Sequence, residues 1–273
     1  MKLFRGDVSS EEKLIIEKED LTPSKACYAL SELNAILLID EFDVVCDDVK
    51  REVAEFIKQL SDENSTFKVL LVGIASDGAS LIAGHPSVNR CLNEIQLSRI
   101  EDRFLYEIIE TGEMGLDLVF NNEVKTSIIE ISNGFPYFTH LIGKESADVA
   151  LSEGKGEIDM EILSVALQRA VINTEGQLKR DYDNAVISSR TDVYPSILYA
   201  AAKFKENKFT IQDWIAQIKT DTGRMLNNNH MSNYIGRFTK KDKGAVITKT
   251  ARGVYKISDP RMPSYIKMVN SDK

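Results

Sequence analysis

One short apolar run most constrains the fold of this chain. Residues 35–39 read AILLI, and the acid pair Asp40-Glu41 follows directly. The run is too short for a buried helix and is typical of a parallel strand covered on both faces. Apolar residues at helical spacing follow over residues 49–60, and a second apolar run, FKVLLVGIA, covers residues 67–75. The pattern predicts a strand, a helix and a strand, with the two strands parallel.

Four polar residues follow the two predicted strands: Asp40, Glu41, Ser76 and Asp77. Because ligands bind at the carboxyl ends of parallel strands, we expect these residues to gather at a site there. An aspartate at a strand end can hold Mg²⁺ through water, and an adjacent glutamate can orient or deprotonate the water that attacks a γ-phosphate. The alternative is that a buried strand simply meets solvent in two acids.

Further elements flank this unit. Residues 14–18 (LIIEK) and 94–97 (EIQL) predict short strands, and Thr22-Pro23 supplies an N-cap and a first-turn proline for a helix through Leu33. The chain from residue 98 to 189 has an almost wholly helical pattern, which breaks at residues 134–136 (GFP) and turns at residues 154–156 (GKG).

The last third of the chain changes from helices to a hairpin. The predicted elements are helices over residues 194–206, 210–218 and 228–240 and strands over residues 245–250 and 254–258. Thr210 and Asp213 predict a capping-box variant at the second helix, and Gly253 lies in the predicted turn, where glycine adopts positive φ most easily. Three helices and a hairpin predict a winged helix.

These elements predict three domains and an α/β fold class. We expect an α/β core with parallel strands over residues 1–97, a helical subdomain over residues 98–189, and a winged helix, which is an α+β domain, over residues 190–273. Three widely spaced cysteines with apolar neighbours, Cys27, Cys46 and Cys91, predict reduced core thiols.

Charge is distributed unevenly along the chain. The formal net charge is −8, yet from Arg190 onward 16 Lys and Arg stand against 7 Asp and Glu, a net of +9. Residues 1–189 hold 18 Lys and Arg against 35 Asp and Glu. Because neutralised phosphates dominate affinity for nucleic acid, we expect double-stranded DNA to contact the last third only.

The third helix of the predicted winged helix should enter a major groove. The residues expected on its outer face are Asn228, Asn229, His230, Ser232, Asn233 and Arg237. Asparagine reads adenine and arginine reads guanine, whereas Lys240, Lys241 and Lys243 are placed as phosphate anchors. Arg252, at the tip of the hairpin, is placed to probe a minor groove. The alternative is that the winged helix contacts protein and that its lysines serve solubility.

The octet ILLIDEFD at residues 36–43 resembles the Walker B element of the AAA+ ATPases. Residues 69–76 (VLLVGIAS) resemble the sensor-1 strand, and residues 85–90 (HPSVNR) resemble the stretch preceding the arginine finger of initiator-like members. Residues 134–137 (GFPY) are similar to the GxP motif of the lid, although no arginine follows where sensor 2 would stand. The chain from about residue 21 to 268 thus resembles the origin-recognition (initiator-like, STAND-related) group of P-loop NTPases.

The resemblance implies catalytic roles for three residues. Asp40 would hold Mg²⁺ through water, Glu41 would act on the attacking water, and Arg90 would stabilise transition-state charge in the site of a neighbouring subunit. For Arg90, a plain surface arginine is the alternative. The nucleotide-binding residues that the resemblance implies are Ser76, Asp77, Gly134 and Pro136.

One motif of that family is missing, because G-x-x-x-x-G-K-[ST] occurs nowhere in the 273 residues. Its backbone amides and lysine would cradle the phosphates. The resemblance implies ATP and Mg²⁺ as cofactors of the complete protein, whereas we expect neither to bind tightly to this chain alone. Our hypothesis is that the chain is the C-terminal part of a longer ATPase, with a missing Walker A segment or neighbouring ATPase subunits as partners.

The sequence therefore favours a DNA-binding protein derived from an AAA+ ATPase. A STAND-like signalling NTPase or regulator, whose winged helix mediates protein contacts, is the alternative, and a nonfunctional remnant is a third reading. No apolar run approaches the roughly 20 residues that span a bilayer, and the N-terminus lacks a secretory signal. We expect a cytoplasmic protein without membrane contact. The three histidines have no partners at metal-ligand spacing, so no zinc site is predicted.

Overall fold

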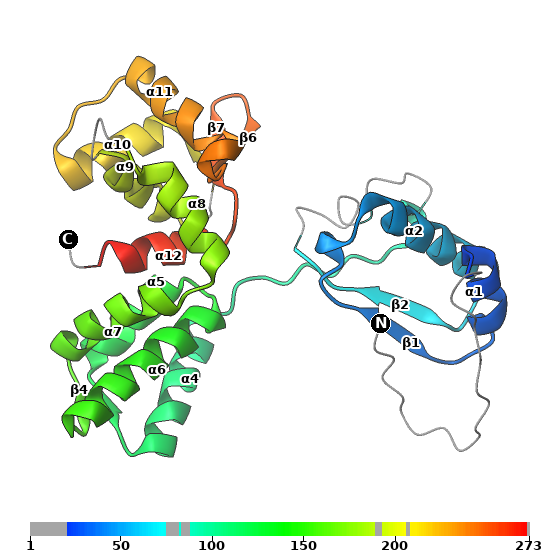
Figure 1. Cartoon of the computed structure of the whole chain (residues 1–273), viewed down its shortest axis with the longest axis horizontal. Helices are drawn as coiled ribbons and strands as arrows, with labels where there is room; N and C mark the ends of the chain where they lie inside the picture. The colour runs from blue at the N-terminus through cyan, green and yellow to red at the C-terminus, as the bar shows by residue number, and fades with distance from the viewer. Residues whose placement is uncertain (1–20, 75–81, 83–87, 189–192, 206–207, 272–273) are drawn as a thin grey trace. The chain divides into compact units, whose positions relative to one another are not determined.

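The computed structural model describes residues 21–74, 82, 88–188, 193–205 and 208–271 and divides into two compact units, Met1–Leu97 and Ser98–Lys273 (Figure 1). Each unit has hydrophobic core clusters of its own. The strand predicted over residues 14–18 lies outside the described residues, and so do Ser76 and Asp77.

The first unit contains a strand, helix, strand arrangement, as the sequence predicts. Its elements are α1 (Pro23–Leu30), β1 (Ile36–Ile39), η1 (Phe42–Val44), α2 (Asp47–Asp62), β2 (Lys68–Leu71) and η2 (Asn89–Cys91). The strands β1 and β2 are parallel, with Leu38 beside Leu70. Helix α1 begins after Thr22, whose side chain accepts a hydrogen bond from the backbone N–H of Lys25. The predicted N-cap is therefore confirmed.

Among the described residues, only one face of the two-stranded sheet is covered. Leu37, on the covered face, is 9% exposed and belongs to a core cluster with residues of α1 and α2, which lie on the same side of the strands (Figure 1). On the opposite face Ile36, Leu38 and Leu70 are 70%, 54% and 43% exposed. The expectation that this strand is buried on both faces is therefore wrong, because both helices pack on one side.

The segment that links the two units is not a strand. Residues 94–97 were expected to form a third strand, but they have no ladder partner in the described structure and are exposed. An isolated apolar alternation of this length lacks the neighbouring strand that would satisfy its backbone groups. This expectation is therefore wrong.

The second unit begins with the expected helices. Its first elements are α4 (Asp102–Leu116), β3 (Val119–Phe120), α5 (Asn122–Ser132), α6 (Pro136–Glu153), β4 (Glu157–Ile158), α7 (Met160–Asn173) and α8 (Gly176–Val186). The break predicted at residues 134–136 separates α5 from α6, and Gly154 ends α6 with a φ of 66°. Two-residue strands, β3 and β4, pair in parallel within this helical region.

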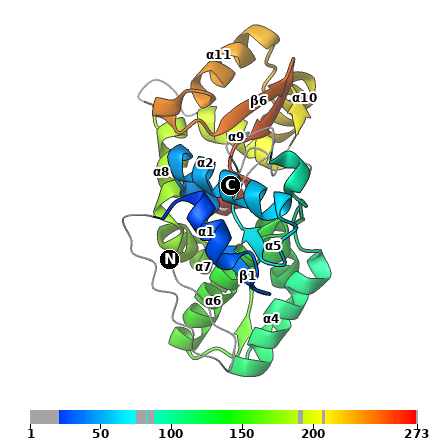
Figure 2. The same cartoon turned by 90° about the vertical axis from the view of Figure 1, so that its right-hand side faces the viewer.

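The remaining elements are α9 (Val193–Ala202), β5 (Phe209–Thr210), α10 (Ile211–Thr222), α11 (Asn228–Phe238), η3 (Lys241–Lys243), β6 (Ile247–Ala251), β7 (Val254–Ile257) and α12 (Met262–Val269). The three strands form an antiparallel sheet in the order β5-β7-β6. The capping box of Thr210 and Asp213 is present, and Gly253 turns the hairpin with a φ of 75°. Figures 1 and 2 both show the hairpin beside α11. Local sequence signals thus predicted the helices α9, α10 and α11 and the hairpin, but not β5, η3 or α12.

Helix α12 joins the two halves of the second unit. It packs against α5, α7, α8 and α9. The hydroxyl of Ser264 donates a hydrogen bond to the carbonyl of Ser132 at 3.0 Å, and the amine of Lys267 donates to the carbonyl of Glu130 at 3.0 Å. No helix was predicted here from sequence. The helical region and the hairpin region therefore share one continuous core.

The three cysteines lie in different environments. Cys27 is 1% exposed, and its thiol donates a hydrogen bond to the carboxylate of Glu63. Cys46 is exposed at the N-cap of α2, and Cys91 is half-buried. The expectation of core thiols is confirmed for Cys27 and wrong for Cys46, whose position at the start of a helix leaves it in solvent.

Candidate functional site

The acid pair lies where β1 ends. Both side chains are exposed, and Oδ1 of Asp40 accepts a hydrogen bond from the backbone N–H of Glu41 at 2.8 Å. Glu41 has a φ of 53°, in the left-handed region that costs a residue with a side chain about 1 kcal/mol. The next residue, Phe42, is buried and donates its N–H to the carbonyl of Val72 at 2.8 Å. This anchor holds the turn in which Glu41 lies.

Asp43 has a structural role at the same edge. Its Oδ1 accepts a hydrogen bond from the backbone N–H of Ile74 at 3.1 Å, which ties the end of β1 to the chain that follows β2. Its carbonyl accepts from the amine of the buried Lys50 at 3.0 Å. Two exposed acids therefore stand on a turn that hydrogen bonds of its neighbours hold in place.

The described residues at this edge supply carboxylates for a Mg²⁺ ion but no cradle for phosphates. Asp40 is the residue that would hold the ion. No group of three or more His, Cys, Asp or Glu side chains in the described part of the chain is arranged to hold a metal. The donor set therefore fits one side of a Mg-nucleotide site and lacks the backbone amides that grip a triphosphate.

Arg90 lies on the surface of the first unit. Its guanidinium is 3.3 Å from a carboxylate oxygen of Asp62, and both side chains are more than half exposed. An exposed pair of this kind contributes at most about 1 kcal/mol. The structure therefore places Arg90 in a weak surface ion pair.

Gly134 and Pro136 belong to the second unit, at the junction of α5 and α6. Gly134 has a φ of 81°, and a Cβ atom at this position would lie 2.5 Å from the Cβ of Arg99. The Arg99 guanidinium lies over the ring of Phe135, 5.2 Å from its centroid. The glycine thus permits a close approach of the chain that leads into α4.

None of the described helices is long and apolar enough to cross a membrane.

Helix α11 presents a polar face to solvent. Its apolar residues Met231, Ile235 and Phe238 are buried. The exposed residues include the five polar residues that were predicted to face outward: Asn228, Asn229, His230, Ser232 and Asn233. The amphipathic period of the helix produces this division.

His230 has a capping role that its sequence position did not signal. The side chain of Asn227 accepts a hydrogen bond from the His230 N–H at 3.0 Å, and Nδ1 of His230 accepts from the Asn227 N–H at 3.4 Å. The ring therefore closes a capping box at the start of α11.

Arg237 does not face outward as expected. Its guanidinium donates hydrogen bonds to three backbone carbonyls at the end of α8: Asn184 at 3.2 Å, Ala185 at 2.6 Å and Ile187 at 2.6 Å. It also lies over the ring of Tyr194, 4.5 Å from the centroid. A cation at a helix C-terminus satisfies carbonyls that lack partners within the helix. Arg237 therefore joins α11 to α8, which corrects its assignment as an outward-facing reader.

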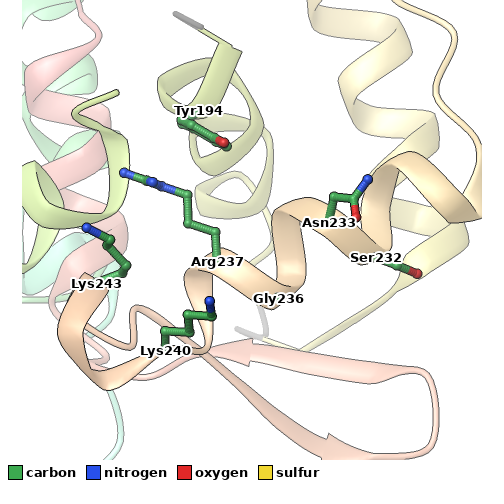
Figure 3. Close-up of a pocket in the computed structure, with 7 residues that line it drawn as sticks. All are labelled: Tyr194, Ser232, Asn233, Gly236, Arg237, Lys240 and Lys243. Atoms are coloured by element: carbon green, nitrogen blue, oxygen red, sulfur yellow. The ribbon is translucent and has the colours of Figure 1, made fainter. Parts of the chain in front are cut away.

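A basic pocket opens between α11 and α9 (Figure 3). It has a volume of about 310 Å³. Its lining residues are Tyr194, Ser232, Asn233, Gly236, Arg237, Lys240 and Lys243. Three of these carry positive charge, and none of the described lining residues is acidic. In a chain whose net charge is −8, such a pocket favours an anion.

A second groove lies on the other side of α11, against the hairpin. Its volume is about 520 Å³. The lining residues are Ser232, Ile235, Gly236, Thr239, Lys241, Ala245, Ile247, Thr248, Lys249 and Tyr255. No acidic residue is among these described residues either, and Ser232 and Gly236 line both cavities. The exposed ridge of α11 thus stands between two acid-free grooves, and we call this second one the hairpin groove.

No family model matches the chain, and no curated protein matches it. Among solved structures, it is similar to the RuvB Holliday junction branch migration motor of Thermotoga maritima, with 13% identity and a TM-score of 0.45 over 88% of this chain and 72% of that one. It is similar to Cdc6p from Pyrobaculum aerophilum, with 12% identity and a TM-score of 0.44 over 95% and 74% of the two chains. A third similar structure is the Aeropyrum pernix ORC1 protein in complex with DNA, with 13% identity and a TM-score of 0.39 over 85% and 63%. Similarity at this level assigns no function to the chain.

Proposed function

We propose that this chain binds double-stranded DNA through a winged helix made of α9, α10, α11 and the β5-β7-β6 sheet. In this proposal α11 enters the major groove and the β6-β7 hairpin is the wing. The observation that carries the proposal is the polar ridge of α11 between two grooves whose described lining residues include no acid. Grooves lined by lysines suit a phosphate backbone, since each bound phosphate displaces a counterion.

The side chains divide into two roles in this proposal. Asn229 and Asn233 are exposed on α11 and can each make the paired hydrogen bonds that adenine offers in the major groove. Lys241 and Lys249, in the hairpin groove, contact phosphates, and Arg252, exposed at the turn of the hairpin, reaches a minor groove. Asn228 and His230 stand at the first turn of α11. The ring of His230 already accepts a hydrogen bond from Asn227 in the capping box, and the backbone carbonyl of Asn228 accepts one from the hydroxyl of Ser232.

A duplex titration tests the proposal. Fluorescence anisotropy of a labelled duplex, measured at several KCl concentrations, should give an affinity that falls steeply as salt rises. The variant Lys249→Gln/Arg252→Gln should bind more weakly, with a smaller salt dependence. The variant Lys144→Gln/Lys155→Gln removes the same charge from α6 and the turn after it, so it should bind as the unaltered chain does.

Two outcomes decide between the candidate partners. Weak binding that does not depend on salt, or equal loss in the control variant, overturns the DNA proposal. A protein partner would then be favoured.

We also propose that the first unit derives from an AAA+ ATPase core and does not hold ATP tightly by itself. The support is the Walker B-like octet together with two exposed acids that lack a phosphate cradle. Isothermal titration of Mg-ATP into the chain should show no saturable binding. Saturable binding that disappears in Asp40→Ala would contradict the proposal, because it would require a cradle within this chain.

A further inference from the structure

The lysines near the end of α11 face two different cavities. Lys240 and Lys243 line the basic pocket, whereas Lys241, which lies between them in sequence, lines the hairpin groove. The short helix η3 produces this split, because it turns the chain directly after α11. Among the described residues, no ion pair occupies Lys240 or Lys243. Their charges are therefore available to a ligand.

The walls of the basic pocket are held in place before any ligand binds. Arg237 is fixed by three carbonyls of α8 and by the Tyr194 ring, which itself lines the pocket (Figure 3). Gly244, next to Lys243, has a φ of 79° and lies so close to α8 that a Cβ atom would be 2.5 Å from the carbonyl oxygen of Asp181. A pocket whose walls are already positioned loses less entropy on binding.

We infer that the basic pocket takes a phosphate group of a DNA strand, so that sugar-phosphate strands flank α11 on both sides. One strand lies in the pocket beside Lys240 and Lys243, and the other lies in the hairpin groove beside Lys241 and Lys249. The pocket contributes affinity without sequence preference, because a phosphate is the same at every base pair. This inference rests on the proposed DNA binding.

The salt dependence of binding tests the pocket directly. The variant Lys240→Gln/Lys243→Gln should lower the slope of log affinity against log salt by about two, since each lysine that contacts a phosphate accounts for about one. The ratio of affinities for two duplexes of different sequence should not change. The variant Lys144→Gln/Lys155→Gln, which removes the same charge elsewhere in the unit, should keep the original slope. Lys144, Lys155 and Lys240 are exposed and Lys243 is half-buried, and a thermal melt verifies that each variant is folded.

The failures of the two proposals are distinguishable. If the unaltered chain binds duplex and the pocket variant keeps its slope, the pocket inference is overturned while DNA binding stands. If the unaltered chain binds no duplex, both are overturned.

The source of the phosphate needs a separate measurement. In ¹⁵N spectra of the full chain, the side-chain amide of Asn233 should shift with duplex DNA and not with inorganic phosphate at the same phosphate concentration and ionic strength. Saturation by inorganic phosphate, with no shift from duplex, would assign the pocket to a free anion and overturn the inference.

Discussion

The guanidinium of Arg237 lies over the ring of Tyr194, 4.5 Å from its centroid, and at the same time donates hydrogen bonds to three carbonyls at the end of α8. Tyr194 in turn packs edge-on against Tyr234 and Phe238 of α11. Arg237 therefore connects three helices. The position of α11, and with it the proposed DNA contact, depends on this arginine.

Arg237→Ala should lower the free energy of unfolding by about 2–3 kcal/mol. The loss comes from charge-assisted hydrogen bonds and from the stacking contact, with carbonyls left unsatisfied. Arg237→Lys should recover less than half of this loss, because an ammonium group cannot replace a planar fork of donors. Urea unfolding measures both. Unchanged stability together with lost DNA affinity would show that Arg237 contacts DNA directly.

Gly244→Ala should be among the most damaging small substitutions in the chain. A methyl group there meets the backbone of Asp181 at 2.5 Å, and the φ of 79° is unfavourable for alanine. We expect a loss of about 3 kcal/mol. Gly253→Ala is the matched control, because its φ of 75° is similar but nothing lies within 4 Å of the added carbon. It should cost about 1 kcal/mol. Equal effects in thermal melts would contradict the close contact with α8.

Neighbouring leucines of β1 should respond very differently to truncation. Leu37→Ala removes a side chain that is 9% exposed and should lower the free energy of unfolding by about 2–3 kcal/mol. Leu38→Ala removes a side chain that is 54% exposed and should lower it by about 0.5 kcal/mol or less. Denaturant unfolding of the two variants measures the difference. A large effect of Leu38→Ala would mean that another polypeptide surface covers this face in solution.

Local signals explain which parts of the fold were predictable. The strand runs, the N-cap at Thr22, the capping box at Thr210 and the hairpin turn at Gly253 each depend on residues adjacent in sequence. The one-sided sheet and helix α12 do not. Whether Leu38 is covered depends on which side α1 and α2 occupy. Helix α12 is stabilised by helices from far earlier in the chain, as the contact of Ser264 with Ser132 illustrates.

The same distinction holds for the candidate interface. Helical periodicity correctly placed Asn229 and Asn233 on the exposed face of α11. The helical period places Arg237 on the same face of α11 as Asn233. Its side chain nevertheless donates hydrogen bonds to carbonyls about 50 residues earlier in the chain. The acceptors are backbone atoms, which carry no sequence signal at all. Periodicity therefore predicts the face of a helix, and long flexible side chains can leave that face.

Asp213 should make the stability of the second unit depend on pH in the acid range. Hydrogen bonds from the hydroxyl and the backbone N–H of Thr210 lower the pKa of this carboxyl below its ordinary value of 3.8. The stabilisation is therefore fully present above pH 3.8 and is lost as the pH falls through the lower pKa of the folded state. The melting temperatures of Asp213→Asn and the unaltered chain should differ most near neutral pH and converge in acid. A constant difference would contradict the role of the charge.

Gly236 should separate the stability of α11 from its proposed DNA contact. It lies inside the helix with nothing within 4 Å of an added Cβ, so Gly236→Ala should stabilise the chain by about 0.5–1 kcal/mol. Because Gly236 lines both grooves, the larger Gly236→Leu should keep the helix yet weaken duplex binding by about tenfold, or about 1.4 kcal/mol. Anisotropy and thermal melts of the same samples test this. If α11 lies in the groove of DNA, the leucine side chain collides with the bases or the phosphate strands. Duplex binding that is unchanged in Gly236→Leu would therefore mean that the ridge of α11 does not enter the groove.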